Sequence, residues 1–194
     1  MDPMNRDRLR ALAVVALLLV LAAAVALLMT GRGGTEQAEA GSVVAELSAL
    51  RSAPGADEKL PVQVANGFVR DAGGQIRAAR AVGEFENSDY YLVPTDDDQV
   101  CLVSQDPGGV SGGACVNRVQ LLEGVSVISH SPDGHRVVAT IVPDGYGPPE
   151  FEGAQVMKRS PVQRNVAFAK LEKGEAELHL QGVAGRPDIT HTVH

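Results

Sequence analysis

The sequence predicts an N-terminal transmembrane helix followed by an α+β, β-rich extracytoplasmic domain with antiparallel hairpins, short N-terminal helices and one disulfide. Residues 11–29 form a run of nineteen positions without a polar side chain. The rest of the chain alternates short apolar stretches with turns rich in Pro, Gly and Asp, which is typical of strands joined by hairpins. Two cysteines, Cys101 and Cys115, complete the pattern, because an even cysteine count outside the cytoplasm favours a disulfide.

The apolar run at 11–29 is just long enough to cross a hydrocarbon core of about 30 Å, which takes roughly 20 residues. Three arginines lie within residues 1–10, and only Arg32 follows the run closely. By the positive-inside rule, the N terminus is therefore expected in the cytoplasm. The chain is expected to divide into a cytoplasmic N terminus at 1–10, a transmembrane helix at 11–29, a linker at 30–41 and an extracytoplasmic β-rich domain at 42–194.

A cleaved signal peptide is the main alternative, and it would make the domain a secreted protein. Ala24-Val25-Ala26 has the small-x-small pattern of a cleavage site. The apolar run continues to Met29, however, beyond the 7–15 residues usual for a signal peptide. An uncleaved anchor is therefore favoured, and either route places the bulk of the chain outside the cytoplasm.

The charge balance excludes one class of partner. The chain holds 17 basic and 24 acidic residues, a net charge of −7, and residues 33–194 alone hold 13 basic and 22 acidic residues, a net charge of −9. Nucleic-acid binding is not expected, because phosphate neutralisation needs clustered Lys and Arg. Trp is absent, which also disfavours an aromatic platform for stacked bases or sugars.

Cys101 and Cys115 are the only cysteines, so one intramolecular pairing is available. The loop between them is short and rich in glycine, and closing a loop of this size contributes about 3 kcal/mol in the chain-entropy model. An intermolecular bridge in a dimer and a metal site are the alternatives. A metal site is disfavoured, because two cysteines without a nearby His pair supply too few ligands.

A helix is expected over Ser42–Ser52, and Pro54-Gly55 should end it. Three apolar side chains fall on one face at the i, i+4, i+7 spacing, namely Val43, Leu47 and Leu50. Residues 60–72 fit either a short helix or a strand. A second short helix is expected over Gln75–Val82, with two basic side chains directed outward, those of Arg77 and Arg80.

Strands are expected beyond residue 89. Tyr90–Val93 and Val100–Ser104 should form one hairpin, and Val125–His130 and His135–Val142 a second. The second hairpin closes at Ser131–Gly134, whose Pro-Asp-Gly order suits a type I turn followed by a residue with positive φ. A second Pro-Asp-Gly at 143–145 should make another bend, and three further strands are expected, at 162–169, 176–181 and 189–193.

Ser111 lies in the segment Gly109–Gly113, which is similar to the nucleophile loop of trypsin-like serine proteases. Val110 stands in place of the usual acidic residue, and no His precedes Ser111. His130 and His135 follow it, but no strand–elbow–helix pattern surrounds the serine. A Gly-rich loop closed by a disulfide accounts for the same residues, so no catalytic role is expected for Ser111.

Two patterns resemble metal sites without completing one. His130 and His135 flank a turn and, with Asp133, would bind a metal or titrate as a pH sensor only if a further ligand or partner fixed them. Asp96–Asp98 would attract Ca²⁺, but the ligand spacing that wraps the ion is missing. No metal and no cofactor is therefore predicted.

Glu84, Glu86 and Asp89 form an acidic cluster around Phe85. Paired carboxylates are required for glycoside hydrolysis. Any acidic chain contains such pairs, however, and this chain is poor in the aromatic side chains that hold sugars. The cluster is therefore expected to be a solvated surface.

Several short motifs occur in order between about residue 47 and residue 169. They are Leu47–Arg51, Ala56-Asp57, Leu60-Pro61, Tyr90–Pro94, Val100–Val103, Gly113–Cys115, Ile141–Gly145 and Arg164–Val166. Through these motifs the chain resembles a loosely defined group of actinobacterial secreted or membrane-anchored proteins. The resemblance implies a membrane anchor and bridging cysteines, and it carries over no catalytic residue.

These observations favour a non-catalytic binding or interaction module at the cell envelope, with an envelope protein as partner. Two alternatives stay open. One is an extracytoplasmic hydrolase that uses Ser111 or the acidic cluster, and the other is a sensory or regulatory ectodomain. Residues 1–10 are too short for a cytoplasmic signalling domain, so a sensory role would require a partner within the membrane.

Overall fold

A computed structural model of the chain describes residues 41–53, 60–61, 64, 78–109, 111–131 and 133–193. The chain divides into two compact units, residues 1–41 and residues 42–194, and the fold described below is that of the second. The predicted anchor at 11–29 and almost all of 60–72 lie outside the described residues. Within the described residues, no helix is long and apolar enough to span a membrane.

The described part of the second unit is a β-rich domain with three short helical segments, η1 (Val43–Glu46), α2 (Ser48–Arg51) and α4 (Arg118–Glu123). Its strands are β1 (Arg80–Phe85), β2 (Ser88–Pro94), β3 (Val100–Gln105), β4 (Ser111–Val116), β5 (Val125–His130), β6 (Arg136–Ile141), β7 (Glu150–Glu152), β8 (Val156–Arg159), β9 (Val166–Leu171), β10 (Ala176–Leu180) and β11 (Ile189–Val193).

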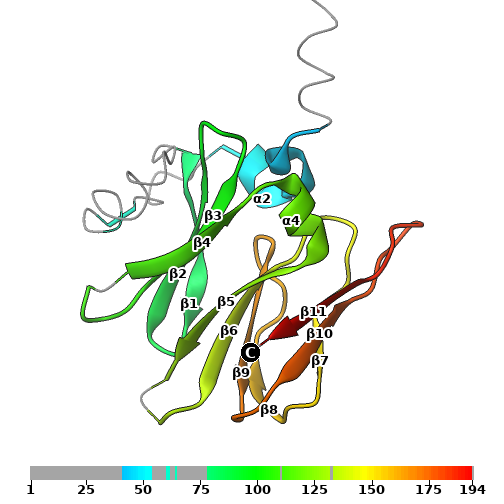
Figure 1. Ribbon diagram of the computed structural model, residues 1–194. Helices are drawn as coiled ribbons and strands as arrows, with labels where there is room; N and C mark the ends of the chain where they lie inside the picture. Colours follow the sequence, from blue (N-terminus) through cyan, green and yellow to red (C-terminus); the bar gives the residue numbers. More distant parts are fainter. Residues whose placement is uncertain are drawn as a thin grey trace, which may run out of the picture. The chain divides into compact units, whose positions relative to one another are not determined.

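The strands form three antiparallel sheets, which follow one another as layers in Figure 1. Sheet 1 has the order β1-β2-β3-β4, sheet 2 has β5-β6-β9-β8, and sheet 3 has β11-β10-β7. Consecutive hairpins build sheet 1, whereas the chain passes back and forth between sheets 2 and 3. The antiparallel, β-rich fold predicted from the sequence is therefore confirmed, together with its short helices.

Successive side chains of a strand point to opposite faces of its sheet, and the apolar faces pack the sheets against one another. Leu92 and Leu102 of sheet 1 are buried in one apolar cluster with Ile141 and Phe168 of sheet 2. The opposite face of sheet 2 packs against sheet 3 in a second cluster, which includes Leu178. Sheet 2 is thus covered on both faces, and all six residues of β6 (RVVATI) are buried, including Arg136 and Thr140.

The outer face of sheet 1 is also covered. Tyr91, Val93 and Val103 pack there with Leu60 and Val64 in a third apolar cluster. The same face carries the two cysteines, because Cys101 on β3 and Cys115 on β4 are direct cross-strand partners. Their sulfurs are 2.04 Å apart, so the predicted disulfide is confirmed.

Removal of the disulfide is expected to destabilise the domain while preserving its fold. The double variant Cys101→Ala/Cys115→Ala should lose about 3 kcal/mol of unfolding free energy, the contribution expected for a loop of this size. Denaturant unfolding followed by circular dichroism would measure the loss. Wild-type protein in reductant is the matched control and should show a similar loss, whereas a change below about 0.5 kcal/mol in both would contradict the prediction.

Two expectations for the N-terminal part are wrong. The helix expected over 42–52 is interrupted at Leu47, whose backbone is extended, and only two short helical turns form on either side. Side chains from elsewhere in the fold hold these turns, since Asp98 bonds to the amide of Val43 and Asn165 to the amide of Ala49. Arg80 lies in β1 instead of a helix, and it is buried instead of pointing outward.

Other boundaries differ because pairing partners far along the chain decide them. The strand expected over 162–169 begins only at Val166, since Arg164 and Asn165 occupy the turn with positive φ. β7 and β8 were not expected, and each exists through pairing with a later strand, β10 or β9. The helix α4 was also not expected, although Asn117 and Gln120 form a capping box at its start.

Candidate functional site

A groove runs between β4 at the edge of sheet 1 and β5 at the edge of sheet 2. Both strands adjoin α4 and separate as they leave it (Figure 1). The groove has a volume of about 390 Å³, which falls in the range of ligand-binding clefts. Its walls are residues from both edges and from the end of β3, namely Ser104, Asp106, Gly112, Gly113, Ala114, Ser126, Val127, Ile128 and Ser129.

Hydrogen-bond alternation shows which backbone groups of β4 face the groove side. The amide of Thr95 donates to the carbonyl of Gln99, which makes these residues a hydrogen-bonded pair. Such pairs alternate along an antiparallel ladder, so Cys101 bonds to β2 and forms a non-hydrogen-bonded pair with Cys115. Three residues of β4 consequently direct their N–H and C=O groups away from β3, at Ser111, Gly113 and Cys115.

The same rule applies to β5. The amide of Ser131 donates to the carbonyl of His135 at 2.9 Å, next to the last pair of the β5–β6 ladder. The backbone groups of alternate residues therefore point away from β6, at Ser126, Ile128 and His130. Among the described residues no strand pairs with this edge of β5 or with the outer edge of β4.

The other sheet edges carry features that prevent further strand pairing. β1 and β8 each contain a register shift, and β8 also bears Lys158 and Arg159. β7 has three residues, two of them Glu, and follows Pro148-Pro149. β11 lies under the end of α4, because a Cβ placed on Gly124 would be 2.8 Å from that of His191. β4 and β5 have no Pro, no Lys and no register shift.

Small residues line the β4 wall of the groove. Gly112 and Gly113 are exposed, and the space where a Cβ of Gly112 would lie is open. The absence of a side chain at Gly113 has a structural reason, since a Cβ built there would lie 2.3 Å from the carbonyl oxygen of Leu102 on β3. Asp106 is the one charged residue on the groove wall, and it accepts a hydrogen bond from the Ser88 hydroxyl at 2.6 Å.

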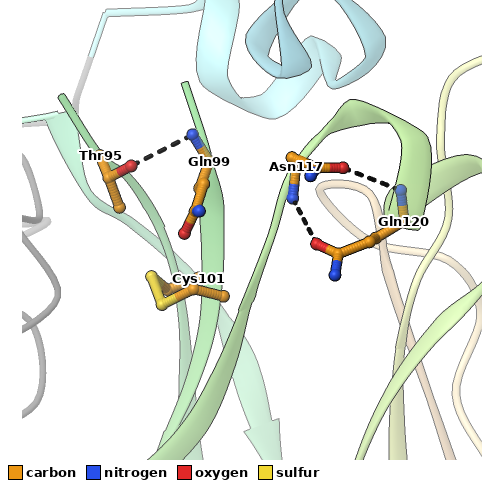
Figure 2. The surroundings of a disulfide bond; sticks show 6 residues. Thr95, Gln99, Cys101, Asn117 and Gln120 are labelled. Carbon is orange, nitrogen blue, oxygen red and sulfur yellow. Dashed lines mark hydrogen bonds between the residues drawn. A yellow bond between two sulfur atoms is a disulfide. The ribbon is translucent and has the colours of Figure 1, made fainter. Parts of the chain in front are cut away.

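The C-terminal end of β4 is held by two features, the disulfide and the start of α4, which Figure 2 shows together. The disulfide ties Cys115 to β3 on the face away from the groove. Immediately afterwards, Asn117 accepts from the amide of Gln120 while the Gln120 side chain accepts from the amide of Asn117. The open edge of β4 is therefore presented by a fixed strand.

Ser111, the residue compared above with a protease nucleophile, begins β4 opposite Gln105. His130 ends β5 and is exposed. His135 contacts Asp133, with Nε2 3.9 Å from the carboxylate oxygen, but that carboxylate is already bonded by the hydroxyl of Ser131.

Of the three residues considered above as a metal or pH site, Asp133 is bound by a lysine from sheet 2. Lys170 contacts the second oxygen of Asp133 at 2.6 Å and also bonds Glu86 at 2.9 Å. The hydrogen bond from Lys170 lowers the pKa of Asp133, and its bonds to Asp133 and Glu86 raise the pKa of Lys170. The pKa of Glu86 is lowered by hydrogen bonds from Lys158 and then Lys170. No group of three or more His, Cys, Asp or Glu side chains is placed to hold a metal within the described part of the chain.

The two acidic clusters have structural contacts. Glu86 bonds Lys158 at 2.8 Å as well as Lys170, so it joins the β1–β2 turn to sheet 2. Glu84 and Asp89 are exposed and face each other across the same hairpin. In the cluster 96–98, the carboxylate of Asp98 accepts from the amide of Val43.

A second polar cluster, the helix-docking cluster, joins the N-terminal turns to the sheets. Its members are Glu46, Asn165, Asp144, Arg118 and Arg186. Glu46 is buried and accepts from Arg118 on α4 and from Arg186 in the β10–β11 loop, each within 3 Å. Burial alone would raise the pKa of Glu46, but these two hydrogen bonds outweigh it and lower the pKa.

The helix-docking cluster makes stability depend on acid pH. A carboxylate whose pKa is lowered by folding stabilises the fold above its unfolded pKa, near 4.5, and loses this contribution as pH falls through the folded pKa. The unfolding free energy is therefore expected to fall below about pH 4.5 with a slope of up to about 1.4 kcal/mol per pH unit for each such group.

Denaturant unfolding of wild type and Glu46→Gln at pH 7, 5, 4 and 3 would measure this dependence. The variant should be less stable at pH 7 and should show a shallower fall below pH 4.5, because one proton-binding group is gone. Parallel curves for the two proteins would contradict the prediction. Glu84→Gln is the matched control, since Glu84 is exposed.

Comparison with known proteins gives no relative: no family model, no curated protein and no solved structure matches the chain. The candidate site therefore rests on the geometry of the described residues. A larger hollow of about 630 Å³ lies between β7 and the β8–β9 hairpin and is lined by Phe151, Phe168, Arg159 and several prolines. It opens beside β7 and β8, the edges with features that oppose further strand pairing.

Proposed function

We propose that this chain is a membrane-anchored, non-catalytic protein-binding module at the cell envelope. In this proposal residues 11–29 span the membrane, residues 1–10 lie in the cytoplasm and residues 42–194 act outside it. The observation that carries the binding role is the groove between β4 and β5, where two unprotected sheet edges lie next to each other. Natural sheets usually block such edges, and an edge left open is a ready template for another chain.

Location and binding can be tested in one system, the full-length chain in the membrane of intact cells. A membrane-impermeant amine reagent should label Lys158, whose side chain is 59% exposed, without cell lysis. Labelling that requires lysis would contradict the proposed topology. Release of the domain from the washed membrane would instead support cleavage and secretion.

The binding role predicts a specific protein neighbour outside the cytoplasm. An impermeant crosslinker applied to the same cells should give a discrete adduct that contains this chain and one envelope protein. A chain that is labelled from outside and yet forms no adduct would count against a binding module.

The competing hydrolase hypothesis has its own test. A fluorophosphonate probe should leave the chain unlabelled if the module is non-catalytic. Labelling of wild type that disappears in Ser111→Ala would overturn the proposal.

A further inference from the structure

We propose that the groove binds an extended peptide segment of a partner protein, which adds to β4 as a fifth strand of sheet 1. This inference rests on the proposed binding function and names the chemistry of the partner. An unpaired strand edge offers a donor and an acceptor at every second residue, and only another extended backbone matches that spacing. On β4 this row consists of the outward groups of Ser111, Gly113 and Cys115.

β4 is the preferred edge for two reasons. Gly112 and Gly113 are exposed and carry no side chain that would cover the row, whereas the groove-lining residues 126–129 of β5 are half-buried. β4 is also fixed at its C-terminal end, by the disulfide at Cys115 and by the capping box of α4 that follows. A strand that is already ordered loses little conformational entropy when it binds.

The charge of the groove selects part of the peptide sequence. Asp106 lies at the end of the groove away from α4, beside the start of β4, and it is the charged residue of the lining. Every strand pair in the three sheets is antiparallel, and an antiparallel ligand would run from α4 toward Asp106. A Lys or Arg near the C-terminal end of the bound segment would therefore lie next to this carboxylate, in an environment of net negative charge.

The volume of the groove favours a single strand over a second copy of this domain. About 390 Å³ admits a short extended segment, whereas a second β4 would arrive with its own β5 and α4 attached. The space beside β4 is bounded by β5, which joins the same helix. A single extended segment therefore matches this space better than a folded domain does.

The probe is a fluorescein-labelled, C-terminally amidated peptide of sequence Thr-Val-Thr-Val-Thr-Val-Lys, titrated with the full-length chain in a mild detergent and followed by anisotropy. We expect saturable binding, weakened at least fivefold when Lys is replaced by Glu. Asp106→Asn should remove this preference, because the amide keeps an acceptor oxygen for Ser88 but loses the charge. The absence of saturable binding up to 1 mM peptide would overturn the inference.

N-methylation of the probe tests the backbone contact directly, without changing the protein. Methyl groups on alternate residues remove the donors from one edge of the peptide, and methyl groups on the other set remove those of the opposite edge. One methylated peptide should lose binding at least tenfold and the other should retain it. Retention by both, or loss by both, would contradict addition to a single edge.

Protein variants then place the peptide on β4. Gly112→Val should weaken binding at least tenfold, because its side chain enters open space in the groove and meets no neighbour within 4 Å. Gly108→Val is the matched control in the same hairpin, also with open space around it, and should bind as wild type. Thermal melting checks that both variants are folded. Equal affinity for wild type and both variants would then place the peptide elsewhere and overturn the inference.

Two further outcomes separate this inference from its alternatives. A concentration-dependent dimer that disappears in Gly112→Val would mean that a second copy occupies β4. An envelope protein that crosslinks in cells to residues outside the groove would leave the proposed binding function intact and refute the groove as its site.

Discussion

Asn165→Ala is expected to lower the free energy of unfolding by about 3–4 kcal/mol. Asn165 is buried in the helix-docking cluster, accepts from the amide of Ala49 at 2.8 Å and donates to the carbonyl of Val142 at 2.9 Å. Alanine leaves these two backbone groups, one half-buried and one buried, without their side-chain partner, which costs about 2–3 kcal/mol together. Its φ of 64° adds a second cost, roughly 1 kcal/mol, because Asn tolerates this region better than Ala does.

A second substitution separates the two costs. Asn165→Gly keeps the backbone conformation free of strain and loses only the hydrogen bonds, so it should destabilise by about 1 kcal/mol less than the alanine variant. Asn87 is the matched control, since it has a φ of 65° but is exposed in the β1–β2 turn. Asn87→Ala should cost only about 1 kcal/mol, and equal losses at both positions would show that the bonds of Asn165 contribute nothing.

Phe168→Ala is the other substitution with a large expected effect, about 3–5 kcal/mol of unfolding free energy. Phe168 lies on β9 in the middle sheet and is 3% exposed. Its ring stacks on Phe85 of sheet 1 with centroids 5.4 Å apart and meets Tyr90 at 4.7 Å. Removal of the ring opens a cavity where the two sheets meet.

Urea unfolding of the full-length chain in detergent would measure this effect, with Phe151→Ala as the control. Phe151 is half-buried at the edge of sheet 3, so its loss should cost less than half as much. A Phe168 variant as stable as the Phe151 variant would show that the interface between sheets 1 and 2 is not the main core.

Two hairpins of the fold, β2–β3 and β5–β6, were predictable from the sequence, because local signals specify them. β1 and β4 were not, since a helix was expected at the first and a Gly-rich loop at the second. The apolar stretches on either side of Ser131–Gly134 pair as expected, and the turn has the predicted positive φ at Gly134. The disulfide was predictable for a different reason, since two cysteines allow one intramolecular pairing. Asn117 and Gln120 also have the spacing of a capping box, which is a local signal for the start of α4.

The remaining elements depend on partners distant in sequence. β7 and β8 have the sequences EFE and VMKR, whose polar residues give no strand pattern, and pairing with β10 and β9 makes them strands. The groove could not be predicted either. It exists because β4 and β5 end their sheets on the same side, and a sequence does not show which strand edges stay unpaired.

The passage of the chain between sheets 2 and 3 has a consequence for how the domain opens. The path leaves sheet 2 after β6, enters sheet 3 at β7, returns for β8 and β9, and leaves again for β10 and β11. Neither sheet can therefore detach without breaking the other, whereas β1–β4 form a continuous meander. Native-state amide hydrogen exchange should show sheets 2 and 3 opening as one cooperative unit, with the buried amides of β6 among the slowest, and sheet 1 opening at a lower free energy. A ligand strand on β4 would then slow exchange first in the part of the molecule that opens most easily.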